Sequence, residues 1–106
     1  MKQKVLVTGA NCYIGRNVIN YLLDSNIDVV AVDISLNKII SEKVKKIEIN
    51  IFENTDYLFS NLQNVGTCIH LAWRNGFVHN SITHLEDISL HYKFLKKIHE
   101  FGIKNI

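Results

Sequence analysis

The sequence contains no proline and only five glycines among 106 residues, which excludes collagen-like and low-complexity chains. Its two cysteines, Cys12 and Cys68, form no Cys-x-x-Cys motif, which argues against a zinc knuckle or a dithiol redox site. The net charge of +2 is too small to indicate nucleic-acid binding. No apolar run approaches the roughly 20 residues of a membrane span, and the run at residues 5–7 is too short for a signal peptide. We therefore expect a soluble cytoplasmic protein with neither nucleic-acid nor membrane partners.

Short apolar runs alternate with amphipathic segments along the chain. Strands are predicted at residues 5–7, 29–32, 47–51 and 65–72. Helices are predicted at residues 14–23, in a short segment capped by Asn54 or Thr55, and at residues 82–101 before Gly102. Residues 35–44 are compatible with a short helix and a turn, residues 73–81 are typical of a loop, and residues 103–106 resemble the approach to a fifth strand.

The long helical segment at residues 82–101 has apolar residues at steps of three and four. This spacing predicts a buried stripe made of Leu85, Ile88, Tyr92, Leu95 and Ile98. Strands that alternate with helices indicate βαβ units and a parallel sheet covered on both faces. The sequence therefore predicts an α/β fold, with a doubly wound parallel sheet of about four strands that ends at the start of a fifth.

A glycine-containing turn lies between the first strand and the first helix, where residues 8–15 read TGANCYIG. Gly9 suits the tight turn, Gly15 lets the helix pack closely on the sheet, and the helix start suits a pyrophosphate. Asp33 ends the second strand, where a carboxylate accepts hydrogen bonds from both hydroxyls of an adenosine ribose and repels a 2′-phosphate. This order favours a Rossmann-like NAD site over an NADP site. A tight turn that binds nothing is the structural alternative.

Residues 8–15 resemble the first motif of the extended short-chain dehydrogenase/reductase family, which includes NAD-dependent sugar-nucleotide epimerases and dehydratases. Residues 70–72 resemble the segment after the family's fourth strand, which lines the cofactor cleft, and residues 101–106 resemble its lead into strand five. The resemblance covers essentially the whole chain. It implies the NAD-binding part of an enzyme that oxidises a nucleotide-sugar hydroxyl by hydride transfer to NAD and later returns the hydride.

The resemblance also implies which residues bind the dinucleotide. They are Gly9, Asn11, Cys12, Tyr13, Ile14, Gly15, Asp33, Asn50, Ile51, Leu71, Ala72 and Trp73. Cys12 stands where the family has a glycine that permits close backbone approach to the pyrophosphate. Near Asn50 the family often has an acid close to the adenine, and the Asn50 carbonyl oxygen can accept a hydrogen bond from an amino group. Asp87 falls where an asparagine usually stands in the helix after strand four.

The family's catalytic pair is Tyr-x-x-x-Lys on a helix after strand five, and the sequence ends at Ile106, before that strand is complete. Tyr92 and Lys96 have the same spacing, but their helix precedes strand five and Tyr92 belongs to the predicted buried stripe. We therefore expect no catalytic residue here. Residues 1–106 are expected to be the N-terminal part of a dinucleotide-binding Rossmann domain without a substrate domain, truncated and inactive alone.

Two other functional classes stay open, a non-catalytic dinucleotide-binding sensor or subunit module and a flavodoxin-like domain without a dinucleotide. His84, Asp87 and His91 share a helix face at a spacing that a metal site accepts, although a polar face is favoured and we expect no metal. Trp73 and Arg74 follow the fourth strand, where ring stacking and phosphate binding compete with core packing and a surface charge. The incomplete fifth strand predicts a homodimer through an open sheet edge.

Overall fold

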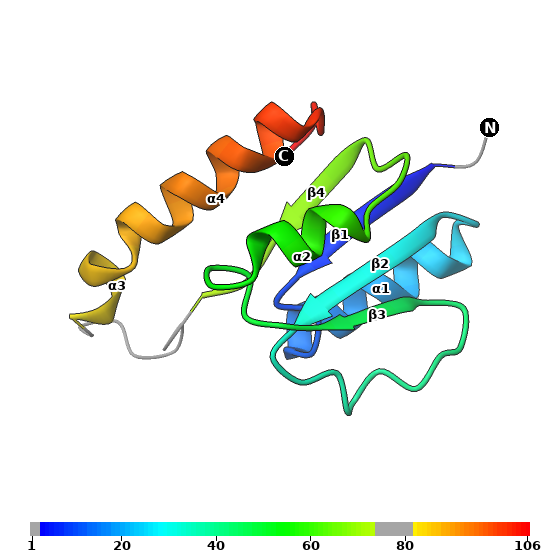
Figure 1. The fold of residues 1–106 in the computed structure, drawn as a ribbon. Coiled ribbons are helices and arrows are strands. Elements are labelled where there is room, and N and C mark those ends of the chain that lie inside the picture. Colours follow the sequence, from blue (N-terminus) through cyan, green and yellow to red (C-terminus); the bar gives the residue numbers. More distant parts are fainter. Residues whose placement is uncertain (1–2, 74–81) are drawn as a thin grey trace.

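The computed structural model describes residues 3–73 and 82–106, which form a parallel sheet between helices (Figure 1). The four strands are β1 (Lys4–Thr8), β2 (Asp28–Asp33), β3 (Lys45–Glu48) and β4 (Thr67–His70), in the order β3-β2-β1-β4. The helices are α1 (Tyr13–Asp24), α2 (Thr55–Ser60), α3 (Thr83–Glu86) and α4 (Ile88–Phe101). The predicted α/β fold with a parallel, doubly wound sheet is therefore confirmed.

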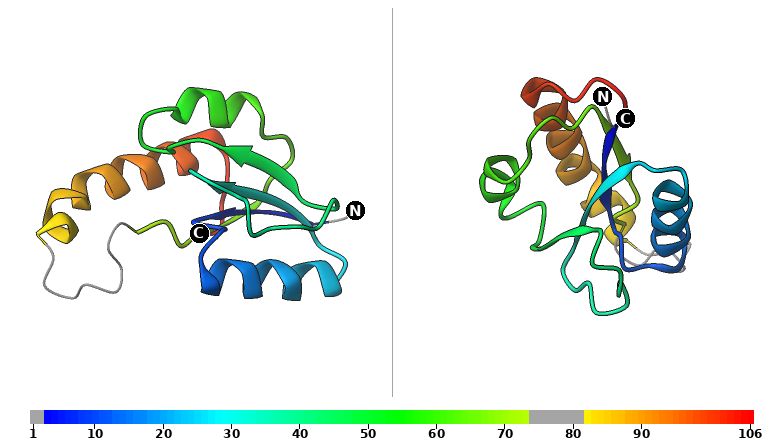
Figure 2. Two further views of the ribbon diagram at one scale, coloured as in Figure 1. Left: turned by 90° about the horizontal axis from the view of Figure 1, so that it is seen from below. Right: turned by 90° about the vertical axis from the view of Figure 1, so that its right-hand side faces the viewer.

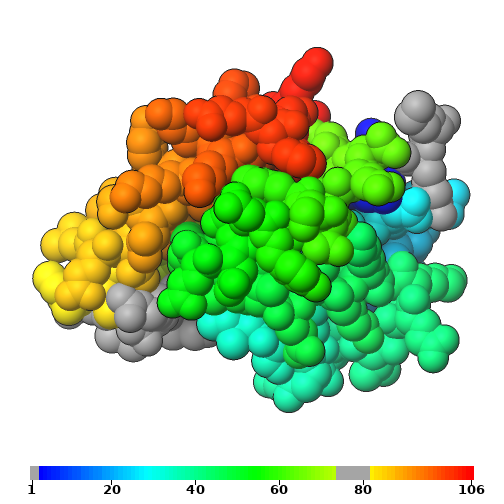
Figure 3. All heavy atoms as spheres, viewed as in Figure 1, coloured from blue at the N-terminus to red at the C-terminus, as the bar shows by residue number. Residues whose placement is uncertain are grey.

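The sheet separates two apolar cores because successive strand residues point to opposite faces. Figure 2 shows α1 on one face of the sheet and α2 and α4 on the other. The core under α1 includes Val5, Val7, Ile19, Leu22, Val29 and Ala31. The core under α2 and α4 includes Leu6, Val30, Val32, Leu58, Phe94 and Ile98. On the face that Figure 3 displays, α2 (green) and α4 (orange) meet side by side over this second core.

Two predicted segments differ from the structure around β3. Residues 35–44 form turns and no helix, and they are anchored by the buried side chains of Leu36 and Ile39. The third strand was expected at residues 47–51 but ends at Glu48, because its partner β2 ends at Asp33, opposite Glu48. The alternation of isoleucines that suggested the longer strand continues into the turn that leads to α2.

The predicted helix at residues 82–101 is divided at Asp87 into α3 and α4, and the predicted buried stripe is largely wrong. Asp87 is buried and has a backbone ψ of −7°, away from the helical value of about −42°. The buried residues of α4 are His91, Phe94 and Ile98. Of the predicted stripe, Ile98 is buried and Leu95 partly buried, whereas Leu85, Ile88 and Tyr92 are exposed.

The end of α4 and the segment after it follow the prediction. Gly102 ends the helix with a left-handed φ of 115°, and its N–H donates to the carbonyl of His99. Asn105 then forms an isolated parallel bridge with Thr67, and its carbonyl accepts from the N–H of Cys68 at 2.8 Å. A fourth parallel pairing, to the predicted fifth strand, therefore begins beside β4. Within residues 3–73 and 82–106, no helix has the length and apolar character that a membrane crossing requires.

Candidate functional site

The turn after β1 is built on two backbone approaches that leave no room for a side chain. Gly9 has a φ of +65°, and a β-carbon there would lie 2.6 Å from the amide nitrogen of Ala72. A β-carbon on Gly15 would lie 2.6 Å from the carbonyl oxygen of Gly9. The end of β1, the start of α1 and the segment after β4 therefore pack with their backbones in contact.

Cys12 occupies the N-cap of α1 with an extended backbone, at φ −74° and ψ 167°. Its Sγ accepts a hydrogen bond from the N–H of Gly15 at 3.2 Å, as a serine or aspartate cap would. The side chain is exposed, and no acidic side chain occupies the first turn of the helix. The positive end of the α1 dipole therefore faces the cleft next to a small thiol.

Asp33, at the end of β2, is joined directly to this turn. One carboxylate oxygen accepts from the N–H of Asn11 at 3.0 Å and the other from the N–H of Ile34 at 2.8 Å. The Asn11 side chain extends the connection, since it donates to Asn37 and accepts from the N–H of Lys38, each at 2.9 Å. The acid, the glycine turn and the loop after β2 therefore form one hydrogen-bonded unit.

A cleft of about 540 Å³ opens at the carboxyl edge of the sheet, where ligands of open α/β sheets bind. The predicted site residues that line it are Gly9, Cys12, Asp33, Asn50, Ile51, Leu71, Ala72 and Trp73. The remaining four lie outside its lining. Asn11 braces the loop, Gly15 is buried beneath the turn, and Tyr13 and Ile14 are exposed on α1.

The cleft also has lining residues that the sequence analysis did not assign to the dinucleotide site. They are Val32, Ile34, Ile49, Phe52, Glu53, Asp87 and Leu90. Most of them follow the carboxyl ends of β2 and β3, so extending each predicted strand end by a few residues would have found them. Asp87 and Leu90 reach the cleft only because α4 packs on the sheet, which residue spacing alone does not reveal.

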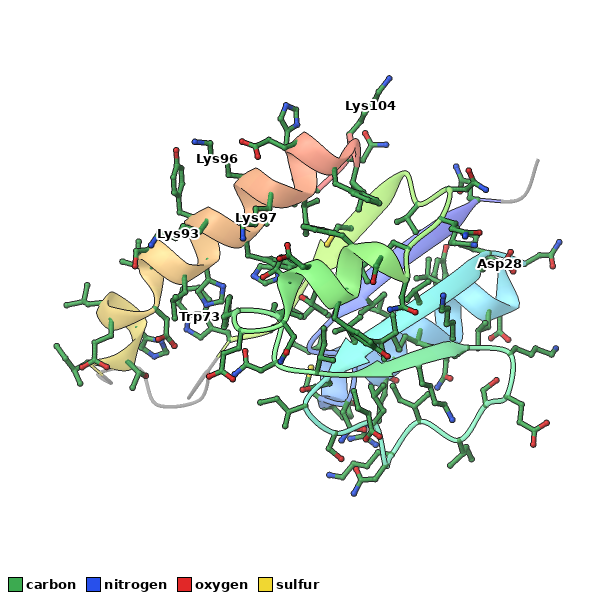
Figure 4. The ribbon with its side chains drawn as sticks, in the orientation of Figure 1. Asp28, Trp73, Lys93, Lys96, Lys97 and Lys104 are labelled. Carbon is green, nitrogen blue, oxygen red and sulfur yellow. The ribbon has the colours of Figure 1, made fainter. Side chains whose placement is uncertain are left out.

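Trp73 lines one side of the cleft and packs against a series of hydrogen-bonded side chains from β1, β4 and α4. The Thr8 hydroxyl lies 2.6 Å from Nδ1 of His70, and Nε2 of His70 lies 2.8 Å from Nδ1 of His91. Trp73 stacks on the His91 ring with the centroids 4.2 Å apart, and its indole N–H donates to Nδ1 of His84. Figure 4 shows Trp73 beside the first turns of α4.

Burial lowers the pKa of both linked histidines. The pKa of His70 falls to about 4, mainly because the ring is desolvated and secondarily because of His91. Burial also lowers the pKa of His91, and this effect is partly opposed by the carboxylate of Asp87. Both rings are therefore neutral at pH 7.

The structure assigns no catalytic or metal-binding arrangement to the helical residues that the sequence analysis considered. Tyr92 is 65% exposed, so its predicted packing is wrong, and neither Tyr92 nor Lys96 lines the cleft. Among the described residues no three His, Cys, Asp or Glu side chains cluster as a metal site requires. Arg74 and His79, in the predicted loop, lie outside the described residues.

Residues 5–104 match the NAD dependent epimerase/dehydratase family. The chain belongs to this family. It is 35% identical over 111 residues to dTDP-6-deoxy-L-talose 4-dehydrogenase (NAD(+)) from Aggregatibacter actinomycetemcomitans. The match covers 96% of this chain and 39% of that relative. The family is one of NAD-dependent enzymes of sugar-nucleotide metabolism, as the sequence motifs predicted.

Solved structures of epimerases share the fold. UDP-glucose 4-epimerase from Thermus thermophilus, in complex with NAD, superposes with a TM-score of 0.79 at 18% identity, over 96% of this chain and 35% of that one. UDP-glucose 4-epimerase from Thermotoga maritima, with UDP-glucose, superposes with a TM-score of 0.77 at 22% identity, over 96% and 36%. The chain thus spans about a third of the length of these enzymes.

Proposed function

We propose that the cleft binds NAD and that the chain is the cofactor-binding part of an NAD-dependent epimerase/dehydratase-like oxidoreductase that acts on a nucleotide sugar. The observation that carries this proposal is the direct hydrogen bond between the Asp33 carboxylate and the glycine turn. This bond supports the proposal because it joins Asp33, which would bind the ribose, to the turn before the helix start, where a pyrophosphate would lie.

The residues present fit the parts of the dinucleotide. Each Asp33 oxygen accepts one backbone hydrogen bond and keeps a second lone pair for a ribose hydroxyl. Gly9 and Cys12 would border the pyrophosphate, and Asn50 and Ile51 the adenine. Leu71, Ala72 and Trp73 would line the other end of the cleft. When bound, NAD supplies a hydride acceptor, and the protein's part is to orient it and to exclude water.

Catalysis in the whole protein is a separate part of the proposal. Within residues 3–73 and 82–106 we find no tyrosine and lysine that face the cleft together. We therefore propose that residues 1–106 bind the dinucleotide without turning a substrate over. Mixing this chain with the remaining part of a related epimerase tests the point. Restored activity supports an enzyme fragment, and a complex that binds NAD without activity supports a sensor or subunit module.

Isothermal titration calorimetry with NAD, NADP and AMP, together with amide NMR shifts, tests the binding directly. We expect weak but saturable NAD binding that shifts the amides of residues 9–15, and weaker binding of NADP because the Asp33 carboxylate repels a 2′-phosphate. Asp33→Asn should weaken NAD binding and reduce the preference over NADP, whereas Asp24→Asn, on the last turn of α1, is a matched control. The absence of any NAD-dependent shift at millimolar ligand would contradict the proposal.

We also propose that the chain self-associates through the sheet edge at β4. This strand is the last in the sheet order, and the only bridge that its residues form on the outer side among the described residues is the one between Thr67 and Asn105. Unpaired strand edges favour pairing with another chain. Sedimentation equilibrium should show dimers, and a monodisperse monomer at high concentration would refute this arrangement.

A further inference from the structure

We propose that Thr8, His70 and His91 form a positioning chain that holds Trp73 in place as a wall of the cleft only while both imidazoles are neutral. Apart from Thr8, which ends β1 at the start of the glycine turn, the proposal concerns residues outside that turn and outside the Asp33 contact. Its consequence for NAD binding rests on the proposed function, whereas the hydrogen bonds among Thr8, His70 and His91 can be tested without any ligand.

The hydrogen bonds of Thr8 determine the tautomer of His70. The Thr8 hydroxyl oxygen accepts from the N–H of Leu71 at 3.1 Å and from the N–H of Ala72 at 3.3 Å. Because a hydroxyl oxygen has two lone pairs, its own proton is left to donate to Nδ1 of His70, 2.6 Å away. His70 is therefore the Nε2–H tautomer, and this N–H donates to Nδ1 of His91 at 2.8 Å.

The hydrogen bonds that join Thr8, His70 and His91 cannot accommodate an additional proton. The gap between Thr8 and His70 and the gap between His70 and His91 each hold one proton already. Protonation of either ring at its remaining nitrogen would set two hydrogens against each other in one of these gaps. His91 Nε2, at the end of the chain, is buried and has no hydrogen-bond partner among the described residues, so the charged ring would gain no contact there.

The surroundings of the two rings are mostly apolar. Phe52 packs edge-on against His91, with the centroids 4.9 Å apart, and Phe94 packs against His70 at 5.1 Å. These phenyl rings come from the segment before α2 and from α4, and they leave little water to solvate a charge.

Among the described residues, three titratable groups lie near the hydrogen-bonded series of Thr8, His70 and His91. Asp87, at the start of α4, raises the His91 pKa and opposes the effect of burial. Glu53 adjoins Phe52 and lines the same cleft, and the ring of His84 of α3 also stacks on Trp73. The Asp87 carboxylate favours a charged His91, but it supplies no acceptor inside either gap. Acid should therefore separate His91 from His70 and release the stacked indole.

Fluorescence of the single tryptophan tests the inference, because an indole that is released from its stack on His91 meets more water and emits at a longer wavelength. In the 106-residue chain without ligand, we expect the emission maximum to move to longer wavelength with a midpoint below pH 6.5. His91→Phe keeps a stacking ring without a titrating group, so it should abolish the transition. His99→Gln, on the exposed end of α4, and His84→Gln should retain it. Emission that stays constant down to pH 4.5, or the same transition in His91→Phe, would overturn the proposal.

Two further measurements cover the case in which a variant is unstable or the chain unfolds in acid. Long-range ¹H–¹⁵N NMR of the wild-type chain at pH 7 should show the Nε2–H tautomer for both His70 and His91, and an Nδ1–H or charged ring on either one refutes the proposal. If far-UV circular dichroism shows unfolding in the same pH range, its midpoint must move to lower pH in His91→Phe. An unmoved midpoint is likewise a refutation.

The pH dependence of NAD affinity tests whether these hydrogen bonds affect the cleft. NAD affinity should fall as the pH passes through the fluorescence midpoint in the wild type and stay constant over that range in His91→Phe. A fluorescence transition without NAD binding at any pH would contradict the proposed function and leave the positioning chain supported. NAD binding that does not change across the transition would show that Trp73 does not shape the cofactor site.

Discussion

Replacing Gly15 by alanine tests the close packing on which the cleft depends. A β-carbon at this position would lie 2.6 Å from the carbonyl oxygen of Gly9 and 2.7 Å from that of Ala10. Ordinary β-carbon contacts begin at 3.4 Å, so the turn and the helix must separate by about 0.7–0.8 Å. Both obstacles are backbone atoms, which cannot move aside by changing a rotamer.

The magnitude follows from two opposing effects. Overpacking costs about 1–3 kcal/mol and lies at about 2–3 kcal/mol here, because both obstacles are backbone atoms, while replacing glycine by alanine within a helix returns about 1 kcal/mol. We therefore expect Gly15→Ala to lower the free energy of unfolding by about 1–2 kcal/mol, which corresponds to a Tm decrease of at least about 4 °C. The displaced turn would also lengthen the 3.0 Å bond between Asn11 and Asp33, and NAD binding should weaken.

Urea and thermal unfolding followed by circular dichroism measure this effect, with Gly66→Ala as the matched control. A β-carbon on Gly66 meets no atom within 4 Å, so this variant should be neutral or stabilised by up to about 1 kcal/mol. If Gly15→Ala proves as stable as the wild type, or gains stability as Gly66→Ala does, the contact between α1 and the turn is looser than the structure indicates and the reasoning fails.

Three further changes have defined outcomes. Cys12→Ala removes the cap of α1 and should lower the free energy of unfolding by about 1 kcal/mol in urea titrations, whereas Cys12→Ser should preserve it. Because the pKa of His70 is lowered to about 4 from 6.5, the unfolded chain binds more protons between these values. Stability should therefore fall as the pH drops from 6.5 to 4, by at most about 1.4 kcal/mol per pH unit for this group, which urea unfolding at each pH would measure. Asn11→Ala should speed hydrogen exchange at the Lys38 amide, and unchanged protection would contradict the bracing role of Asn11.

The sequence was sufficient to predict the sheet and the glycine turn because these depend on local rules. Gly9, Gly15 and Asp33 each follow or precede a short apolar run, and the carboxyl ends of parallel strands meet at one edge. Residues at the ends of four strands could therefore be placed around one cleft from the sequence alone. Whether each of them touches a dinucleotide stays a prediction.

The long helix shows where pattern reading fails. The predicted stripe of Leu85, Ile88 and Tyr92 has the same helical period as the stripe that is buried. Because its residues are more hydrophobic, hydropathy predicts that the stripe of Leu85, Ile88 and Tyr92 is the buried one. The buried stripe contains Asp87 and His91, which a pattern assigns to water. His91 is 6% exposed because His70, which lies 21 residues earlier, supplies a hydrogen bond. A hydrogen-bond partner that lies far away in the sequence makes the burial of His91 favourable. The spacing of residues within the helix does not reveal such a partner.

The two cysteine thiols differ in exposure, so the one that lines the cleft can be labelled selectively. Cys68 is buried in the core, and desolvation raises its pKa to about 12, so alkylating reagents should spare it in the folded chain. Cys12 is exposed at the mouth of the cleft. A maleimide dye would therefore attach at one place, beside the proposed pyrophosphate position, and its signal would test cofactor binding without any engineered cysteine.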